Sequence, residues 1–223
     1  MNPDFWLERW TQGQIGFHQP EANPYLQKYW PELALPRGAT VFVPLCGKTL
    51  DMRWLHDQGH RVLGLEISRK AVGDFFDDWG VEARIAQQGP YERWEARGIT
   101  VLCGDFFDLR EQDLGDVDAV FDRAALIALP ATMRTAYARK LYDTLPARVL
   151  MLLITLDYEQ AQMAGPPFAV SDREVHTLYA DASSVRRLAA LEVSDAPEYA
   201  RFRERGATRL VERVHLIEKS TTR

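Results

Sequence analysis

The chain has 223 residues, of which 46% are hydrophobic and 26% are charged, and its formal net charge is −5. This balance is typical of a globular protein with a buried core and excludes a largely disordered chain. Basic and acidic side chains are mixed along the sequence, so we expect no binding to nucleic acid or to an anionic membrane surface. The length favours a single domain over residues 1–223.

The sequence lacks the features of an exported or membrane-anchored protein. Its longest apolar stretch, Val149 to Leu156, is far shorter than the roughly 20 residues of a membrane-spanning helix. The first residues lack the basic and apolar segments of a secretory signal. We therefore expect a cytoplasmic protein.

The chain has two cysteines, Cys46 and Cys103. Their spacing matches neither a disulfide framework nor a zinc site, and we expect reduced, buried thiols.

The first 36 residues are aromatic and contain several turn residues. Residues 3–12 follow a helical pattern in which Trp6 and Trp10, four positions apart, share one face. A second segment, Pro24 to Trp30, is expected to end at Pro31. Regular alternation of strands and helices begins only after this region.

Between residues 40 and 80, β-branched apolar runs alternate with helical patterns that stop at glycine. Ser68 is expected to cap the second of these helices. The predicted order is a strand at Thr40–Pro44, a helix at Leu50–Gln58, a strand at Arg61–Ile67 and a helix at Arg69–Trp79.

The remainder of the chain continues this alternation and then departs from it. We predict strands at Ile99–Cys103, Val117–Asp122 and Val149–Leu156, with a helix at Ala131–Thr144. Such alternation indicates a mostly parallel, doubly wound sheet with helices on both faces. The last two strands, Ala189–Ser194 and Arg209–Glu218, have no comparable helix between them, which favours an antiparallel pair at the end of the sheet.

Ligands of open α/β sheets bind beyond the carboxyl ends of the strands, and Glu66 lies at such a position. It follows Gly47 by 19 residues, and an acidic residue about 20 positions after a glycine turn accepts hydrogen bonds from ribose hydroxyls. The alternative is a surface glutamate at a strand end.

The turn from Leu45 to Lys48 has a single glycine, which is sufficient for the uncharged sugar and methionine portion of a sulfonium cofactor. It does not fit a pyrophosphate or a P-loop, since the latter needs glycine where Phe42 stands.

Two further strand ends carry candidate binding residues. Asp105 and Phe106 follow the third predicted strand and could hydrogen-bond to and pack on an adenine, although Phe106 also fits the core. Arg123 follows an apolar strand, where an arginine needs an anionic partner, either a ligand or a neighbouring carboxylate.

Zinc chemistry and hydrolysis through a nucleophile find no support in the sequence. His56 and His60 are four residues apart, but Gly59 interrupts the helix between them, and we expect no metal site. A Gly-x-Ser-x-Gly elbow is also absent from the sequence.

A family resemblance rests on segments spread over nearly the whole chain. They are Trp6 and Trp10, Gly16-Phe17-His18-Gln19, Val43-Pro44-Leu45-Cys46-Gly47-Lys48 with Asp51-Met52, Gly64-Leu65-Glu66-Ile67, Phe121-Asp122-Arg123-Ala124-Ala125-Leu126 and Gly165-Pro166-Pro167-Phe168. In these segments the chain resembles the thiopurine S-methyltransferases, particularly the bacterial ones. The resemblance implies a Rossmann-like class I methyltransferase with an N-terminal helical lid over residues 1–36.

The resemblance also implies a cofactor, S-adenosyl-L-methionine, with S-adenosyl-L-homocysteine as product. The cofactor-binding positions of the family are matched by Trp10, Leu45, Glu66 and Arg123, while Trp6, Phe17, Asp105 and Phe106 close the same pocket beside Gly47. The family holds a small aromatic thiol near Phe17 and two arginines, matched here by Arg123 and, aligned on Gly206, by Arg201.

The implied reaction is S-methylation of small aromatic or heterocyclic thiols by a monomer. Such thiols ionise readily, so Arg123 and Arg201 could stabilise the thiolate without a general base. We expect Trp6, Trp10 and Phe17 to form a lid that becomes ordered with the cofactor. Two alternatives stay open: methylation of selenium or tellurium species or of halide on the same fold, and a nucleotide-binding module without catalysis.

Overall fold

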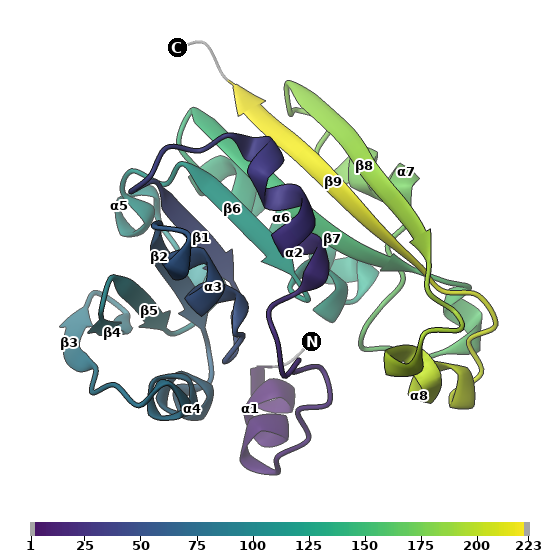
Figure 1. The fold of residues 1–223 in the computed structure, drawn as a ribbon, viewed down its shortest axis with the longest axis horizontal. Helices are drawn as coiled ribbons and strands as arrows, with labels where there is room; N and C mark the ends of the chain where they lie inside the picture. The colour runs from purple at the N-terminus through teal and green to yellow at the C-terminus, as the bar shows by residue number, and fades with distance from the viewer. Residues whose placement is uncertain (1–2, 221–223) are drawn as a thin grey trace. The chain divides into compact units, whose positions relative to one another are not determined.

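A computed structural model describes residues 3–220 (Figure 1). Contacts within the backbone divide the chain into two compact units, Met1–Phe121 with Thr144–Pro146, and Asp122–Asp143 with Ala147–Arg223. This division does not test the single domain expected for residues 1–223, which stays a prediction.

The first unit alternates strands and helices after an N-terminal helical segment. Its elements are α1 Pro3–Thr11, α2 Pro24–Tyr29, the 3-10 turn η1 Trp30–Leu33, β1 Thr40–Pro44, α3 Asp51–Asp57, β2 Arg61–Glu66, α4 Arg69–Trp79, β3 Arg84–Gln88, β4 Tyr91–Ala96, β5 Ile99–Cys103, η2 Phe106–Asp108, α5 Glu111–Leu114 and β6 Ala119–Arg123, whose last two residues fall in the second unit.

The strands of the first unit are ordered β3-β4-β5-β2-β1-β6. β1 pairs in parallel with both β2 and β6, and β2 pairs in parallel with β5. The parallel pairing confirms the alternation expected from the sequence, and it brings the carboxyl ends of β1, β2 and β5 to the same edge. β3 and β4 extend the sheet as an antiparallel hairpin (left in Figure 1).

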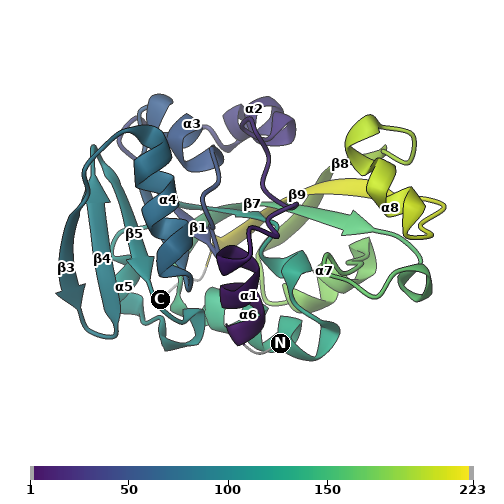
Figure 2. The same ribbon diagram turned by 90° about the horizontal axis from the view of Figure 1, so that it is seen from below.

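Helix α4 shows how local sequence determines an element that supports this edge. Oγ of Ser68 accepts a hydrogen bond of 3.2 Å from the backbone N–H of Ala71, which caps the first turn as predicted. The helix ends at Gly80 with φ of 67°, a left-handed conformation that glycine adopts without strain. Phe75 and Phe76 are buried on its inner face, and the helix packs on β2 and β5 (Figure 2).

The second unit is built on antiparallel strands. Its elements are η3 Leu126–Ala128, α6 Ala131–Thr144, β7 Arg148–Asp157, η4 Gln160–Gln162, α7 Asp172–Leu178, β8 Ser184–Glu192, η5 Pro197–Tyr199, α8 Ala200–Glu204 and β9 Val211–Ser220. The strand order is β7-β9-β8, and β9 is antiparallel to both neighbours. The antiparallel C-terminal pair is therefore confirmed, although both strands are longer than predicted or shifted in position.

Several features were not predicted or were placed differently. The hairpin β3–β4 was missed because β3 is almost wholly exposed and lacks an alternating apolar pattern. Pro31 does not end its segment, since a proline is compatible with the first turn of η1. The short helices α5, α7 and α8 were also missed. Among residues 3–220, no helix has the length and apolarity needed to cross a membrane.

Candidate functional site

The turn after β1 has an unusual backbone. Leu45 and Gly47 both have positive φ, 45° and 53°. Glycine adopts this conformation freely, but it costs a leucine free energy, and such strain is concentrated at functional sites. The backbone N–H of Cys46 donates to the carbonyl of Leu65 at 3.0 Å, which ties the turn to β2. The strained turn is thus held against the end of the neighbouring strand.

Glu66, the last residue of β2, accepts two backbone hydrogen bonds. Oε2 accepts from the N–H of Gly47 and Oε1 from the N–H of Ser68, each at 2.8 Å. The side chain is buried, with 5% exposed, and this burial raises the pKa of the carboxyl although backbone hydrogen bonding by Ser68, Gly47 and Ile67 opposes the rise. A carboxylate has about four acceptor positions, so Glu66 has the capacity to accept from a ligand as well.

Trp10 of α1 lies directly on the same turn. A Cβ atom placed on Gly47 would lie 2.9 Å from Cζ2 of Trp10, so the close approach requires glycine. Phe17 packs edge-on against Trp10 and Trp6, with ring centroids 5.5 and 5.6 Å apart. The structure therefore brings Trp10, Gly47 and Glu66 together, with Phe17 and Trp6 next to Trp10.

The segment after β5 approaches the same strand end. Cys103 is in register with Glu66, and the N–H of Gly104 donates to the Glu66 carbonyl at 2.9 Å. Oδ1 of Asp105 caps η2 by accepting from Phe107 N–H at 2.8 Å. Phe106 is only 3% exposed, which agrees with the core alternative, and its contact with an adenine stays a prediction.

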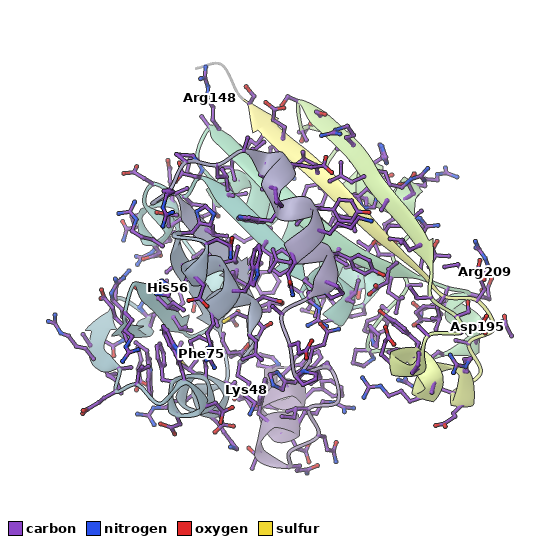
Figure 3. The ribbon with its side chains drawn as sticks, in the orientation of Figure 1. Lys48, His56, Phe75, Arg148, Asp195 and Arg209 are labelled. Atoms are coloured by element: carbon purple, nitrogen blue, oxygen red, sulfur yellow. The ribbon has the colours of Figure 1, made fainter. Side chains whose placement is uncertain are left out.

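Lys48, which the motif Gly47-Lys48-Thr49 would assign to a phosphate, has a structural partner instead. Lys48 is labelled in Figure 3. Its Nζ lies 2.9 Å from Oδ2 of Asp78 on α4. The lysine is paired with a carboxylate of the same unit. The pair joins the turn after β1 to α4.

The two cysteines do not supply a nucleophile to this region. Cys46 is buried and Cys103 is half-buried, and neither forms a disulfide. Burial, reinforced by the charge of Glu66, raises the pKa of the Cys103 thiol to about 11 and that of Cys46 well above its ordinary value. Both are therefore protonated near neutral pH.

Arg123, at the end of β6, belongs to the second unit and follows Asp122, a buried acid for which the sequence predicted no specific role. Asp122 is fully buried; it accepts from the hydroxyl of Tyr137 at 2.8 Å and from the N–H of Leu126 at 3.2 Å. Burial raises the pKa of Asp122 to about 6. Among residues 3–220, no ion pair of Arg123 is found, and whether its partner is a ligand stays a prediction.

Arg201, the other predicted arginine of this unit, lies on α8 in the connection from β8 to β9 (Figure 2). Its side chain is exposed, with the guanidinium carbon 5.4 Å from the ring centroid of Phe202. Phe202 is buried in an apolar cluster with Leu156, Tyr158 and Met163. The buried side chain of Phe202 thus anchors the segment that places Arg201 at the surface.

Comparison with known proteins places the chain in a family. The family described as Thiopurine S-methyltransferase matches residues 1–220. The chain belongs to the thiopurine S-methyltransferase family. Two relatives named thiopurine S-methyltransferase, from Pseudomonas putida and Nitrosospira multiformis, are 49% and 50% identical; the matches cover 98% and 99% of this chain and 100% of each relative. The resemblance inferred from the sequence is confirmed.

Two of the solved structures similar to this family member are methyltransferases of low sequence identity. The 1,6-didemethyltoxoflavin-N1-methyltransferase of Burkholderia thailandensis, solved with bound 1,6-didemethyltoxoflavin and S-adenosylhomocysteine, has a TM-score of 0.64 and 14% identity. The match covers 98% of this chain and 87% of that chain. A SAM-dependent methyltransferase from Anabaena variabilis has a TM-score of 0.66 and 15% identity, covering 98% and 96%. At this identity the comparison shows the fold alone, and it confirms the class I methyltransferase architecture.

Proposed function

We propose that this thiopurine S-methyltransferase family member transfers a methyl group from S-adenosyl-L-methionine to the sulfur of small aromatic or heterocyclic thiols. The proposal is supported by relatives of that name that are half identical over their whole length. The structural observation that carries it is the arrangement of Glu66, Gly47 and Trp10 around the strained turn after β1.

The residues present fit the cofactor. Glu66 is a carboxylate with acceptor positions for ribose hydroxyls, and the backbone bonds from Gly47 and Ser68 hold it in one orientation. The cofactor supplies an electrophilic methyl group on a sulfonium. We assign the ribose to Glu66, the turn at Leu45 and Gly47 to the sugar and methionine portion, and Asp105 with Phe106 to the adenine.

The two arginines are proposed to act on the thiol. A thiolate is the nucleophile, and a guanidinium nearby lowers the pKa of the thiol and keeps the sulfur anionic. The thiolate sulfur forms a bond to the methyl carbon while the bond from that carbon to the sulfonium sulfur breaks, and the electron pair remains on S-adenosyl-L-homocysteine. Arg123 and Arg201 need not accept a proton. Alignment of the reacting atoms can contribute about 7–11 kcal/mol.

We further propose that the protein acts in the cytoplasm as a monomer, on a small molecule and without a nucleic-acid or membrane partner. The mixed surface charges and the net charge of −5 support the last point. Gel filtration at micromolar concentration tests the monomer directly.

The decisive experiment incubates the protein with methyl-labelled S-adenosyl-L-methionine and a panel of acceptors. The panel contains thiopurines, thiophenols, selenite, tellurite and halides, with the phenol analogues of the thiols as matched controls. Label transferred to the aromatic thiols and not to the phenols supports the proposal. Label transferred only to selenium or tellurium species, or to halide, would show that these acceptors, and not thiols, are the substrates. Cofactor binding without any transfer would indicate a binding module.

A further inference from the structure

A loop that neither the fold nor the proposed chemistry explains runs from Tyr158 to Val170 in the second unit. Two side chains hold it closed. The hydroxyl of Tyr158 donates to the carbonyl of Pro167 at 2.7 Å and accepts from the amide nitrogen of Gln160 at 3.1 Å. That nitrogen also donates to the carbonyl of Met163 at 2.7 Å, and the amide oxygen of Gln160 accepts from the N–H of Ala169 at 2.9 Å. The start, middle and end of the loop are thus joined at one point.

One side of this closed loop is attached to the segment that follows Arg123. The N–H of Phe168 donates to the carbonyl of Ile127 at 2.7 Å. Arg134 of α6 donates from Nη1 to the carbonyl of Ala169, also at 2.7 Å. The chain between Arg123 and Ile127 is short, so the position of the loop bears directly on that of Arg123.

The other side of the loop is attached to the segment that carries Arg201. The amide of Gln162 bonds to Thr208, donating to the hydroxyl at 3.0 Å and accepting from the backbone N–H at 3.0 Å. Tyr158 and Met163 pack in the same apolar cluster as Phe202, and Ile127 lies against that cluster. The loop therefore contacts the chain segments of both arginines.

We propose that Tyr158, assisted by Gln160, is a positioning residue that sets the separation of Arg123 and Arg201. The inference rests on the proposed role of these arginines toward a thiolate. Tyr158 is the stronger partner because it is buried, with 7% exposed, whereas Gln160 is exposed and its bonds compete with water. Without the phenol hydroxyl, the side chain at position 158 keeps its apolar packing but no longer bonds to Pro167 and Gln160.

The test is Tyr158→Phe, which removes a single oxygen atom. A lost bond of this kind corresponds to about two- to tenfold in an equilibrium. We expect kcat/KM for a weakly acidic thiol to fall by about that factor, with a smaller fall for a strongly acidic thiol. The affinity for S-adenosylhomocysteine, measured by calorimetry, should change by less than about twofold. Gln160→Leu should show the same pattern with a smaller amplitude.

Tyr142→Phe is the matched control. The Tyr142 hydroxyl donates to the carbonyl of Asp181 at 2.7 Å in the same unit, outside the loop. It should leave kcat/KM unchanged for both thiols. Thermal unfolding of each variant shows whether it is folded at the assay temperature.

Arg201→Met separates failure of this inference from failure of the proposed function. If Arg201→Met is without effect on all thiols, the proposed role of the arginine fails. If it reduces activity while Tyr158→Phe and Gln160→Leu do not, the positioning role is overturned. A Tyr158→Phe loss that is equal for weakly and strongly acidic thiols also overturns it, because a merely structural defect does not depend on substrate acidity.

Discussion

Oε2 of Glu66 accepts a hydrogen bond of 2.8 Å from the backbone N–H of Gly47, which joins the end of β2 to the turn after β1. The other carboxylate oxygen of Glu66, Oε1, accepts from the backbone N–H of Ser68 at the same distance. These bonds orient a buried carboxylate at a fixed place on the sheet edge. A ligand with two adjacent hydroxyls then finds its acceptors already positioned, which lowers the ordering cost of binding.

Glu66→Ala is expected to weaken binding of S-adenosylhomocysteine by about 2–3 kcal/mol, the scale of hydrogen bonds to a charged group. Calorimetry measures the difference. Glu192→Ala is the control and should leave the affinity unchanged, because Glu192, the last residue of β8, forms only an exposed ion pair with Arg209. Unchanged affinity in a folded Glu66→Ala protein contradicts the assignment to ribose.

The contact of Trp10 with Gly47 leads to a prediction about backbone freedom. Gly47→Ala introduces a Cβ atom 2.9 Å from Trp10 Cζ2 at a residue with φ of 53°. The steric contact and the positive φ both destabilise the folded protein, and we expect the free energy of unfolding to fall by about 1–3 kcal/mol. Urea denaturation followed by tryptophan fluorescence measures it.

Gly73→Ala is the matched control for that substitution. Gly73 lies within α4, and an added Cβ meets no atom within 4 Å. Alanine is the better helix former, so Gly73→Ala should raise the free energy of unfolding by about 0.5–1 kcal/mol. A Gly47→Ala protein as stable as Gly73→Ala contradicts the steric role of Gly47.

How much of this site could be read from the sequence depends on the kind of interaction. Thr40–Pro44 and Arg69–Trp79 were predicted with their observed bounds because each has a strong local signal, a β-branched run in one case and a Ser68 cap with a terminal glycine in the other. The chain spacing of Gly47 and Glu66 likewise indicated a binding site. These signals lie within short stretches of chain.

Other features depend on contacts between residues distant in the chain and could not be predicted from the sequence. The bond between Asp122 and Tyr137 joins residues 15 positions apart, and nothing local distinguishes Asp122 from a surface acid at a strand end. The exposed strand β3 forms because it pairs with β4, and its own residues have no strand pattern. Phe106 is buried by packing with residues distant in the chain, and its local sequence does not predict this burial.

The N-terminal helix should respond to the cofactor. α1 has 9 residues, too few for a stable isolated helix, so its order comes from packing of Trp6 and Trp10 on Phe17 and the turn at Gly47. We expect amide hydrogen exchange over residues 3–20 to slow when S-adenosylhomocysteine is added. Peptides from β8 serve as the internal control, and exchange unchanged in α1 would refute the lid.

Asp122 predicts a pH dependence of stability with a defined sign. Burial raises its pKa from the ordinary 3.8 to about 6. Between these values the folded protein keeps a proton that the unfolded chain has released, so stability falls as the pH rises through this window. The effect amounts to about 3 kcal/mol. The substitution Asp122→Asn removes the ionisable group, and the amide that replaces it can still accept from Leu126 and donate to Tyr137.

The measurement compares urea denaturation of the wild type and Asp122→Asn from pH 4 to pH 7. The variant should lose less stability over this range, by about 3 kcal/mol. The substitution Tyr137→Phe removes a hydrogen bond that favours the carboxylate form of Asp122. It should therefore raise the pKa of folded Asp122 above 6 and extend the pH range over which stability falls. Parallel curves for wild type and Asp122→Asn would show that Asp122 does not titrate in this range.

The role of charge beside the thiol is tested through Arg201, because thiolate stabilisation and general-base catalysis respond differently to substrate acidity. Arg201→Lys retains the positive charge and should keep much of the activity, whereas Arg201→Met should lose it. The loss should be small for thiols that are already ionised in water and large for weakly acidic thiols, since only the latter need the protein to lower their pKa. The readout is kcat/KM for a series of thiophenols spanning several pKa units, measured for both variants. Equal depression by Arg201→Met across the series would mean that the arginine positions the ring or supports α8, and that it does not stabilise the thiolate.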